Sequence, residues 1–169
     1  MPIHGVTEKV VLPRLGKVHL GYKKVTGKGV EYPFATDYFV CTPEVQAIFG
    51  EKPKELRIMF PIDDDEVVAQ QWYRSYSSSR GLVCKGDGLT ATCLMDTKTG
   101  ARATRESEKA EMREGVTCQG EQCPEYQRRQ CRRVMNLQFL LPEAPGLGVW
   151  QLDTGSFFSI VNINSNLKL

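Results

Sequence analysis

The chain has 169 residues, of which 41% are hydrophobic, and it carries 22 lysines and arginines against 20 aspartates and glutamates. This composition excludes a wholly disordered chain, and no apolar run approaches the roughly 18 residues of a membrane-spanning helix. Residues 1–17 lack the long apolar core of a signal peptide. We therefore expect a cytoplasmic protein without membrane partners, folded as a single domain over residues 1–169.

The charge is unevenly distributed along the chain. Residues 1–30 hold six lysines and arginines against Glu8 alone, whereas residues 31–70 hold nine acids against three bases. This division suits a basic face for nucleic acid and an acidic face for a basic protein. Solvated loops of both signs would give the same pattern.

The first half of the chain contains both strand and helix signals. Alternating apolar residues at 18–22 predict a half-buried strand. A threonine cap, a proline in the first turn and a following glycine predict a short helix at 43–49. Residues 56–61 predict the next strand. The acidic run at 63–66 then predicts a helix that starts after the aspartates and runs through residues 67–69.

The middle of the chain predicts mainly strands. Residues 82–84, 89–95 and 101–104 read as short strands, the last two joined by a polar turn. Residues 105–114 have strong helix propensity but almost no apolar face, which predicts an exposed helix or a mobile segment.

The last third predicts a hairpin and a helix. Residues 134–141 and 148–152 predict an antiparallel hairpin with a longer loop. Residues 157–169 predict a C-terminal helix, although their β-branched residues also permit a strand. These elements indicate an α+β fold with a mixed or antiparallel sheet, short helices and a small cysteine-rich zinc-binding lobe.

Six cysteines supply the strongest chemical signal. Thiols in a reducing compartment rarely persist as structural disulfides, so metal binding is the first hypothesis. Cys118, Cys123 and Cys131 fall within 14 residues that hold few apolar side chains. A hydrophobic core could not easily order this segment, whereas one zinc ion could. We expect a metal-binding insertion at about residues 105–133.

A fourth ligand must come from elsewhere in the chain. We predict Cys84, because it ends a strand against the glycine turn at 86–88, and Cys93 is the alternative. Cys41 is expected to behave as a small buried hydrophobe. Four protein ligands leave no open position, so the zinc would be structural. An iron–sulfur cluster and unligated or redox-active thiols are the other interpretations.

Four arginines surround Cys131 in the sequence. Guanidinium pairs bidentately with phosphate and carboxylate, so they predict a contact with nucleic acid or with an acidic protein. Alternatively, Arg129 and Arg133 balance Glu121, Glu125 and the acids of residues 106–114. The predicted nucleic-acid or partner contacts are Lys23, Lys24, Arg128, Arg129, Arg132 and Arg133.

The sequence gives little sign of a catalytic centre. The two histidines, His4 and His19, have no sequence partners that would make a triad. The acidic run 63–66 lacks the spaced oxygens and the glycine of a calcium loop. Residues 153–156 are explained by a helix cap. We therefore expect no enzymatic activity; a metal-dependent hydrolase would require an open coordination site, which four cysteines deny.

Several motifs in their order along the chain resemble a known family. They are the segments 12–17, 32–39, 84–88 and 148–156, together with the cluster of Cys118, Cys123 and Cys131. In this order they resemble the recombination directionality factors of phages and mobile elements, which partner large serine integrases and are often labelled metal-binding proteins.

The resemblance implies a non-enzymatic accessory protein. Such a protein would bind a large serine integrase on DNA and favour excision over integration, with Cys84, Cys118, Cys123 and Cys131 as metal ligands. DNA or RNA could be contacted directly or through the partner. The alternative function is a zinc-stabilised nucleic-acid-binding module or a subunit of a ribonucleoprotein complex.

Overall fold

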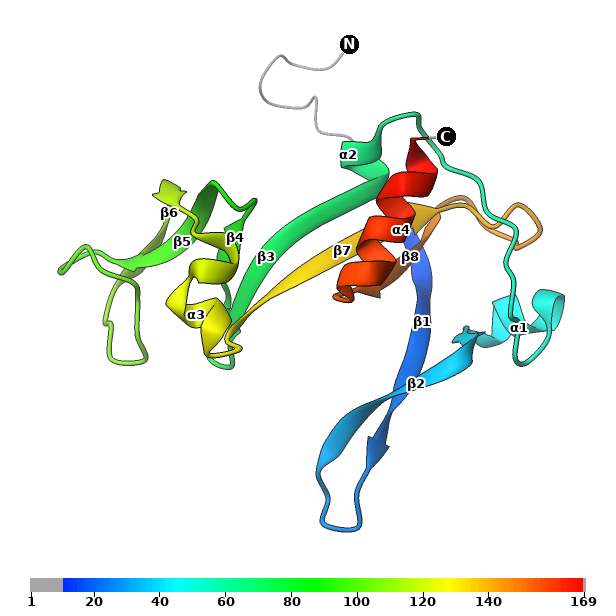
Figure 1. The fold of residues 1–169 in the computed structure, drawn as a ribbon, viewed down its shortest axis with the longest axis horizontal. Helices are drawn as coiled ribbons and strands as arrows, with labels where there is room; N and C mark the ends of the chain where they lie inside the picture. Colours follow the sequence, from blue (N-terminus) through cyan, green and yellow to red (C-terminus); the bar gives the residue numbers. More distant parts are fainter. Residues whose placement is uncertain (1–10, 169) are drawn as a thin grey trace. The chain divides into compact units, whose positions relative to one another are not determined.

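The structure is a computed structural model that describes residues 11–168. It has an α+β fold with short helices and a mixed sheet, as the sequence predicts (Figure 1). Within these residues no helix is long and apolar enough to cross a lipid bilayer. The strands are β1 (Arg14–Val25), β2 (Glu31–Val40), β3 (Ala69–Ser77), β4 (Gly81–Gly86), β5 (Thr90–Asp96), β6 (Ala110–Thr117), β7 (Cys131–Phe139) and β8 (Val149–Thr154). The helices are α1 (Pro43–Phe49), α2 (Asp65–Val68), the 3-10 turn η1 (Gly120–Gln122), α3 (Pro124–Gln127) and α4 (Phe157–Leu167).

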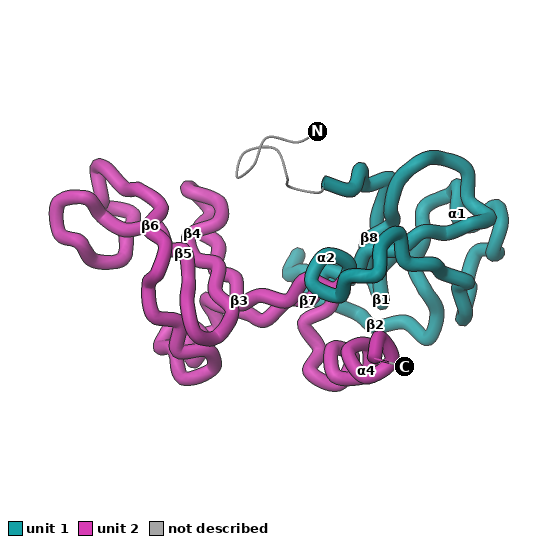
Figure 2. Tube along the Cα trace, turned by 90° about the horizontal axis from the view of Figure 1, so that it is seen from above, with its two compact units in different colours: residues 1–68, 136–153 teal, residues 69–135, 154–169 magenta. Residues whose placement is uncertain are grey.

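The chain divides into two compact units, which are coloured separately in Figure 2. Unit 1 comprises Met1–Val68 and Asn136–Asp153, and unit 2 comprises Ala69–Met135 and Thr154–Leu169. The hydrogen-bonded strand order is β2-β1-β8-β7-β3-β4-β5-β6. Strand β7 therefore begins in unit 2 and ends in unit 1.

Unit 1 is built on β1, which pairs antiparallel with β2 and parallel with β8. Val18, Val45 and Val149 are almost fully buried in it. Gly16 lies opposite Trp150, and a Cβ at Gly16 would lie 2.6 Å from the indole ring. The glycine therefore leaves the space in which the tryptophan packs over β1.

Unit 2 contains an antiparallel run of strands, β3 to β6, together with α3 and α4. Helix α4 confirms the predicted C-terminal helix, and Ser156 caps it by accepting a hydrogen bond from the Ser159 amide. Gln71 of β3 donates to Asn164 of α4 at 2.6 Å. The predicted helix at 43–49 and the strands at 82–84 and 89–95 are also present as α1, β4 and β5.

The predicted helix at 105–114 is wrong, because this stretch leads into the edge strand β6. Met112 pairs with Leu94 of β5, and most of β6 is exposed on both faces, which explains the missing apolar alternation. Gly115 has a φ of 70°, where the β5–β6 register shifts, and this left-handed conformation also interrupts a helix. Long-range pairing outweighs helix propensity in this segment.

Three further boundaries differ from the sequence-based expectations. Residues 101–104 form one bridge, between Arg102 and Met95, and residues 56–61 form one bridge, between Met59 and Leu140. Helix α2 ends at Val68, and Ala69 opens β3 instead of continuing the helix. Segments 56–61 and 101–104 each pair at a single residue, so neither forms the strand that its composition suggests.

Candidate functional site

Five of the six cysteines belong to unit 2. Cys84 lies in β4 and Cys93 in β5, Cys118 follows β6, Cys123 precedes α3, and Cys131 opens β7. Cys41 belongs to unit 1, where it is 8% exposed and its thiol donates to the Phe39 carbonyl, as expected for a small buried residue. All four predicted ligands are therefore carried by the same unit.

The centre of this cluster is the cross-strand pair of Cys84 and Cys93, whose Sγ atoms lie 3.3 Å apart. Both thiols pack with Ala91 in a buried apolar group, against which Cys118 also packs. A Cβ at Gly86 would lie 2.7 Å from the Cys118 Sγ. The bare glycine backbone of β4 therefore lets Cys118 approach the cluster.

Burial is the largest influence on the pKa of two of these thiols, Cys131 and Cys93. Burial raises the pKa of Cys131 to about 11, and the charges of Cys84, Cys123, Glu125 and Cys118 act in the same direction. Cys84, Cys118 and Cys123 therefore each lie within electrostatic range of Cys131. Burial, followed by the hydrogen bond with Cys84, raises the pKa of Cys93 to about 12.

The donor chemistry of this cluster fits zinc, which prefers thiolate ligands. Thiolates need a nearby positive charge, and Arg102 lies beside Cys84 with its Nη1 3.3 Å from Glu125 Oε2. Burial lowers the pKa of Arg102, but hydrogen bonding and charge from Cys84, followed by Glu125, give a net increase. Among the described residues, no three His, Cys, Asp or Glu side chains converge closely enough to hold a metal ion.

The predicted arginines differ in their contacts within unit 2. Arg133 forms an ion pair with Glu121, and its guanidinium lies 5.2 Å from the Phe157 ring centroid, so the interpretation of internal charge balance holds for Arg133. Glu125 pairs with Arg102 and not with Arg129. Arg128 donates from Nε to the Pro124 carbonyl.

Lys23 and Lys24 belong to unit 1, on the β1–β2 hairpin, where both have local partners. Lys23 Nζ lies 2.9 Å from Glu31 Oε2. Lys24 Nζ lies 3.3 Å from the centroid of the Phe34 ring, a cation–π contact. The six predicted basic residues are therefore divided between the units, with two in unit 1 and four in unit 2.

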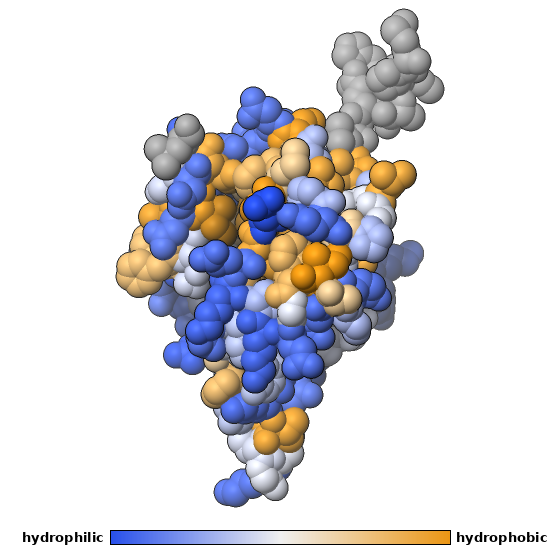
Figure 3. Space-filling model, turned by 90° about the vertical axis from the view of Figure 1, so that its right-hand side faces the viewer, coloured by the Kyte–Doolittle hydropathy of each residue, from blue (hydrophilic) through white to orange (hydrophobic). Residues whose placement is uncertain are grey.

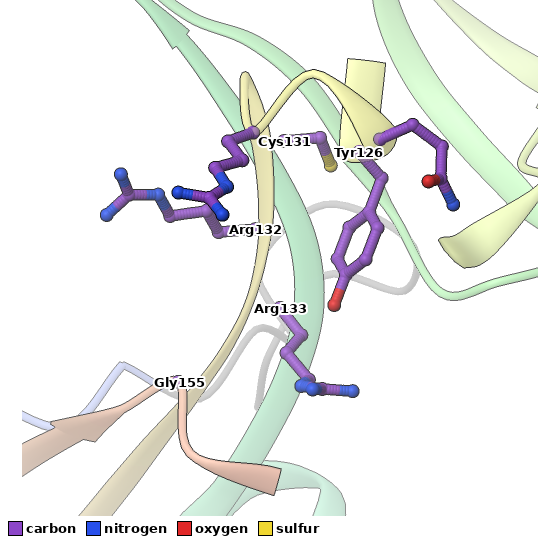
Figure 4. A pocket seen from close by; sticks show the side chains of 7 residues that line it. Tyr126, Cys131, Arg132, Arg133 and Gly155 are labelled. Carbon is purple, nitrogen blue, oxygen red and sulfur yellow. The ribbon is translucent and has the colours of Figure 1, made fainter. Parts of the chain in front are cut away.

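A hollow of about 540 Å³ in unit 2 lies along the start of β7. In Figure 4 the Cys131 sulfur and the Tyr126 ring lie on one side of the strand, and Arg132 extends to the other side. Arg133 returns to the side of Tyr126, as the alternation of a strand requires. The wall of this hollow also contains Arg129 and Gly155.

A second hollow of about 660 Å³ shares Arg129 and Arg132 with the first. Its wall adds Arg74, Arg80 and Arg105, which the sequence reasoning missed. These three residues are isolated in the sequence, and the fold of unit 2 brings them together with Arg129 and Arg132. No local pattern in the chain signals that convergence.

Comparison with known protein families matches residues 15–169 to the family described as Gp3-like, recombination directionality factor-like. The match covers most of the chain, so the protein belongs to this recombination directionality factor-like family, as the resemblance in the sequence indicates. Neither the comparison with curated proteins nor that with solved structures finds a match.

Proposed function

We propose that this protein is a non-enzymatic recombination directionality factor that binds a DNA-bound large serine integrase and favours excision. The family match over residues 15–169 carries this proposal. In physical terms, the factor must bind one arrangement of the integrase more tightly than the other, since equal binding to both shifts no equilibrium.

The β1–β2 hairpin of unit 1 supports a protein partner. Tyr22 is 43% exposed and Phe34 39% exposed, and both line a hollow of about 610 Å³ with mainly apolar walls. Figure 3 shows orange apolar groups interspersed with polar ones down to the hairpin tip. Aromatic side chains are enriched at the centres of protein interfaces, so this face suits the integrase.

We further propose that a structural zinc ion, held by Cys84, Cys118, Cys123 and Cys131, stabilises unit 2. The gathering of these thiols in one unit supports this, as does the cationic Arg102 beside Cys84. The zinc would fix the loops that precede and follow α3, which have few apolar side chains. Cys93 is the alternative to Cys84, because the two thiols lie side by side.

The experiment combines the full chain with a large serine integrase encoded beside it, on excision and integration DNA substrates. We expect a complex on DNA, stimulation of excision and inhibition of integration. The double variant Tyr22→Ala and Phe34→Ala should weaken the complex by at least about tenfold. Leu147→Ala, which truncates a side chain that is 96% exposed outside the hairpin, serves as the matched control. Failure to form a complex in any DNA state would contradict the proposal.

A further inference from the structure

Five arginines line the second hollow of unit 2, and they come from separate segments. Arg74 lies in β3, Arg80 follows β3, and Arg105 lies between β5 and β6; Arg129 and Arg132 complete the set. The hydroxyl residues Ser75, Ser77 and Thr104 line the same wall. Guanidinium and hydroxyl groups are the usual donors to phosphate oxygens.

The positive charge of this hollow is not neutralised within the described part of the chain. No carboxylate of residues 11–168 forms an ion pair with Arg74, Arg105, Arg129 or Arg132. Arg80 donates to the Ser107 carbonyl, which carries no net charge. The acid in the wall, Glu125, is paired with Arg102 outside the hollow. The five guanidinium groups therefore attract an anion with several charges.

The backbone at Arg129 provides a second observation. Arg129 follows Arg128, the C-cap of α3, and has a φ of 62°, a left-handed conformation in which glycine is preferred. Arg129 is the one residue other than glycine with positive φ among those described. An arginine at this position therefore costs stability that a glycine would not.

We propose that this hollow binds the phosphodiester backbone of DNA, without reading its sequence. Guanidinium groups can pair with successive phosphates. Tyr76, which is 62% exposed, lines the hollow and can pack against a sugar or a base. A docked protein helix would need apolar anchors, and here the apolar side chains are Val83, Ala103 and Val134. The site acts whether or not the partner protein is an integrase.

Fluorescence anisotropy of a labelled duplex of about 30 base pairs and arbitrary sequence tests the proposal at low salt. For the full chain, affinity should fall steeply between 50 and 200 mM salt. The triple variant Arg74→Gln, Arg105→Gln and Arg132→Gln should bind at least about tenfold more weakly. Its salt slope should be smaller by about 0.9 for each phosphate that the variant no longer neutralises. The control with the same charge change, Lys28→Gln, Lys52→Gln and Arg57→Gln in unit 1, should stay within about twofold of wild type.

A second variant separates binding from folding. Arg129→Gly removes one guanidinium and relieves the left-handed backbone, so it should raise the melting temperature while weakening DNA binding. Wild-type affinity in the triple variant, or an equal loss in the control, would overturn the proposal. So would tighter binding of polyglutamate than of DNA at the five arginines, because the hollow would then be a site for acidic protein.

Discussion

Gly86 leaves the space that the Cys118 thiol occupies, because a Cβ on Gly86 would lie 2.7 Å from the Cys118 Sγ. The same Cβ would lie 3.0 Å from Ala91 Cβ and 3.1 Å from the Thr90 carbonyl oxygen. Backbone on one side and a thiol on the other leave no direction in which a methyl group fits. The approach of β4 to the cysteine cluster therefore depends on one missing side chain.

The first prediction follows from this packing. Gly86→Ala should destabilise the protein by about 1–3 kcal/mol, because overpacking forces the surrounding atoms to move. Urea denaturation followed by circular dichroism measures the effect. Gly27→Ala is the matched control, since a Cβ there would meet nothing within 4 Å. Equal stability of the two variants would show that Cys118 does not pack against β4 in solution.

The second prediction concerns zinc. Elemental analysis of the reduced protein should give one zinc per chain, and Cys123→Ser should lose it with a clear drop in melting temperature. Cys41→Ser, in unit 1, should keep the metal. Comparing Cys84→Ser with Cys93→Ser identifies the fourth ligand, because only the true ligand's variant loses zinc. Wild-type protein without stoichiometric metal would refute the zinc site.

The third prediction concerns the pH dependence of unit 1. Burial raises the pKa of Asp153. Hydrogen bonds from Lys17, Gln151 and Asn136 lower this pKa by more than burial raises it, so the net shift is downward. A lowered pKa in the folded state means that the ionised carboxylate stabilises the fold above the unfolded pKa, near 3.8. This stability is lost as pH falls through the folded pKa.

Asp153→Asn should therefore reduce stability by about 2 kcal/mol at pH 7 and flatten the stability curve below about pH 4. Denaturation at a series of pH values gives both quantities. Asp63→Asn, which alters an exposed side chain in the acidic run, is the control. A curve for Asp153→Asn parallel to that of wild type would show that another carboxyl group controls acid stability.

The fourth prediction tests the start of α4. Ser156→Ala should cost about 1 kcal/mol, because the Ser159 amide loses its hydrogen bond to the Ser156 Oγ. Ser165→Ala changes a serine inside the same helix, which bonds the Val161 carbonyl, and should be nearly neutral. Equal effects in thermal denaturation would argue against the cap.

Local signals explain which parts of the fold the sequence predicts well. Helix α1 is marked by Pro43 and the following Gly50, and α4 by Ser156, so each end is encoded within a few residues. Strand β6 has no such signal, since its place depends on pairing with β5. The helix predicted at residues 105–114 is wrong for that reason.

The candidate site shows the same division. The spacing of Cys118, Cys123 and Cys131 is visible in the sequence, and the structure places these residues with Cys84 in unit 2. The neighbourhood of Arg74 and Arg105 is set by strand pairing and loop course, to which no local pattern points. The sequence therefore indicates the thiols and two of the five arginines that line the hollow.

The tryptophan that packs over Gly16 also gives the protein an optical label. The chain has two tryptophans, and Trp150 lies in unit 1 while Trp72 lies in unit 2. Trp150 is 4% exposed and should emit at short wavelength, whereas Trp72 has the Lys85 ammonium 3.9 Å from its ring centroid. A Trp72→Phe chain would thus report the melting of unit 1 alone, and a Trp150→Phe chain that of unit 2, without any added dye.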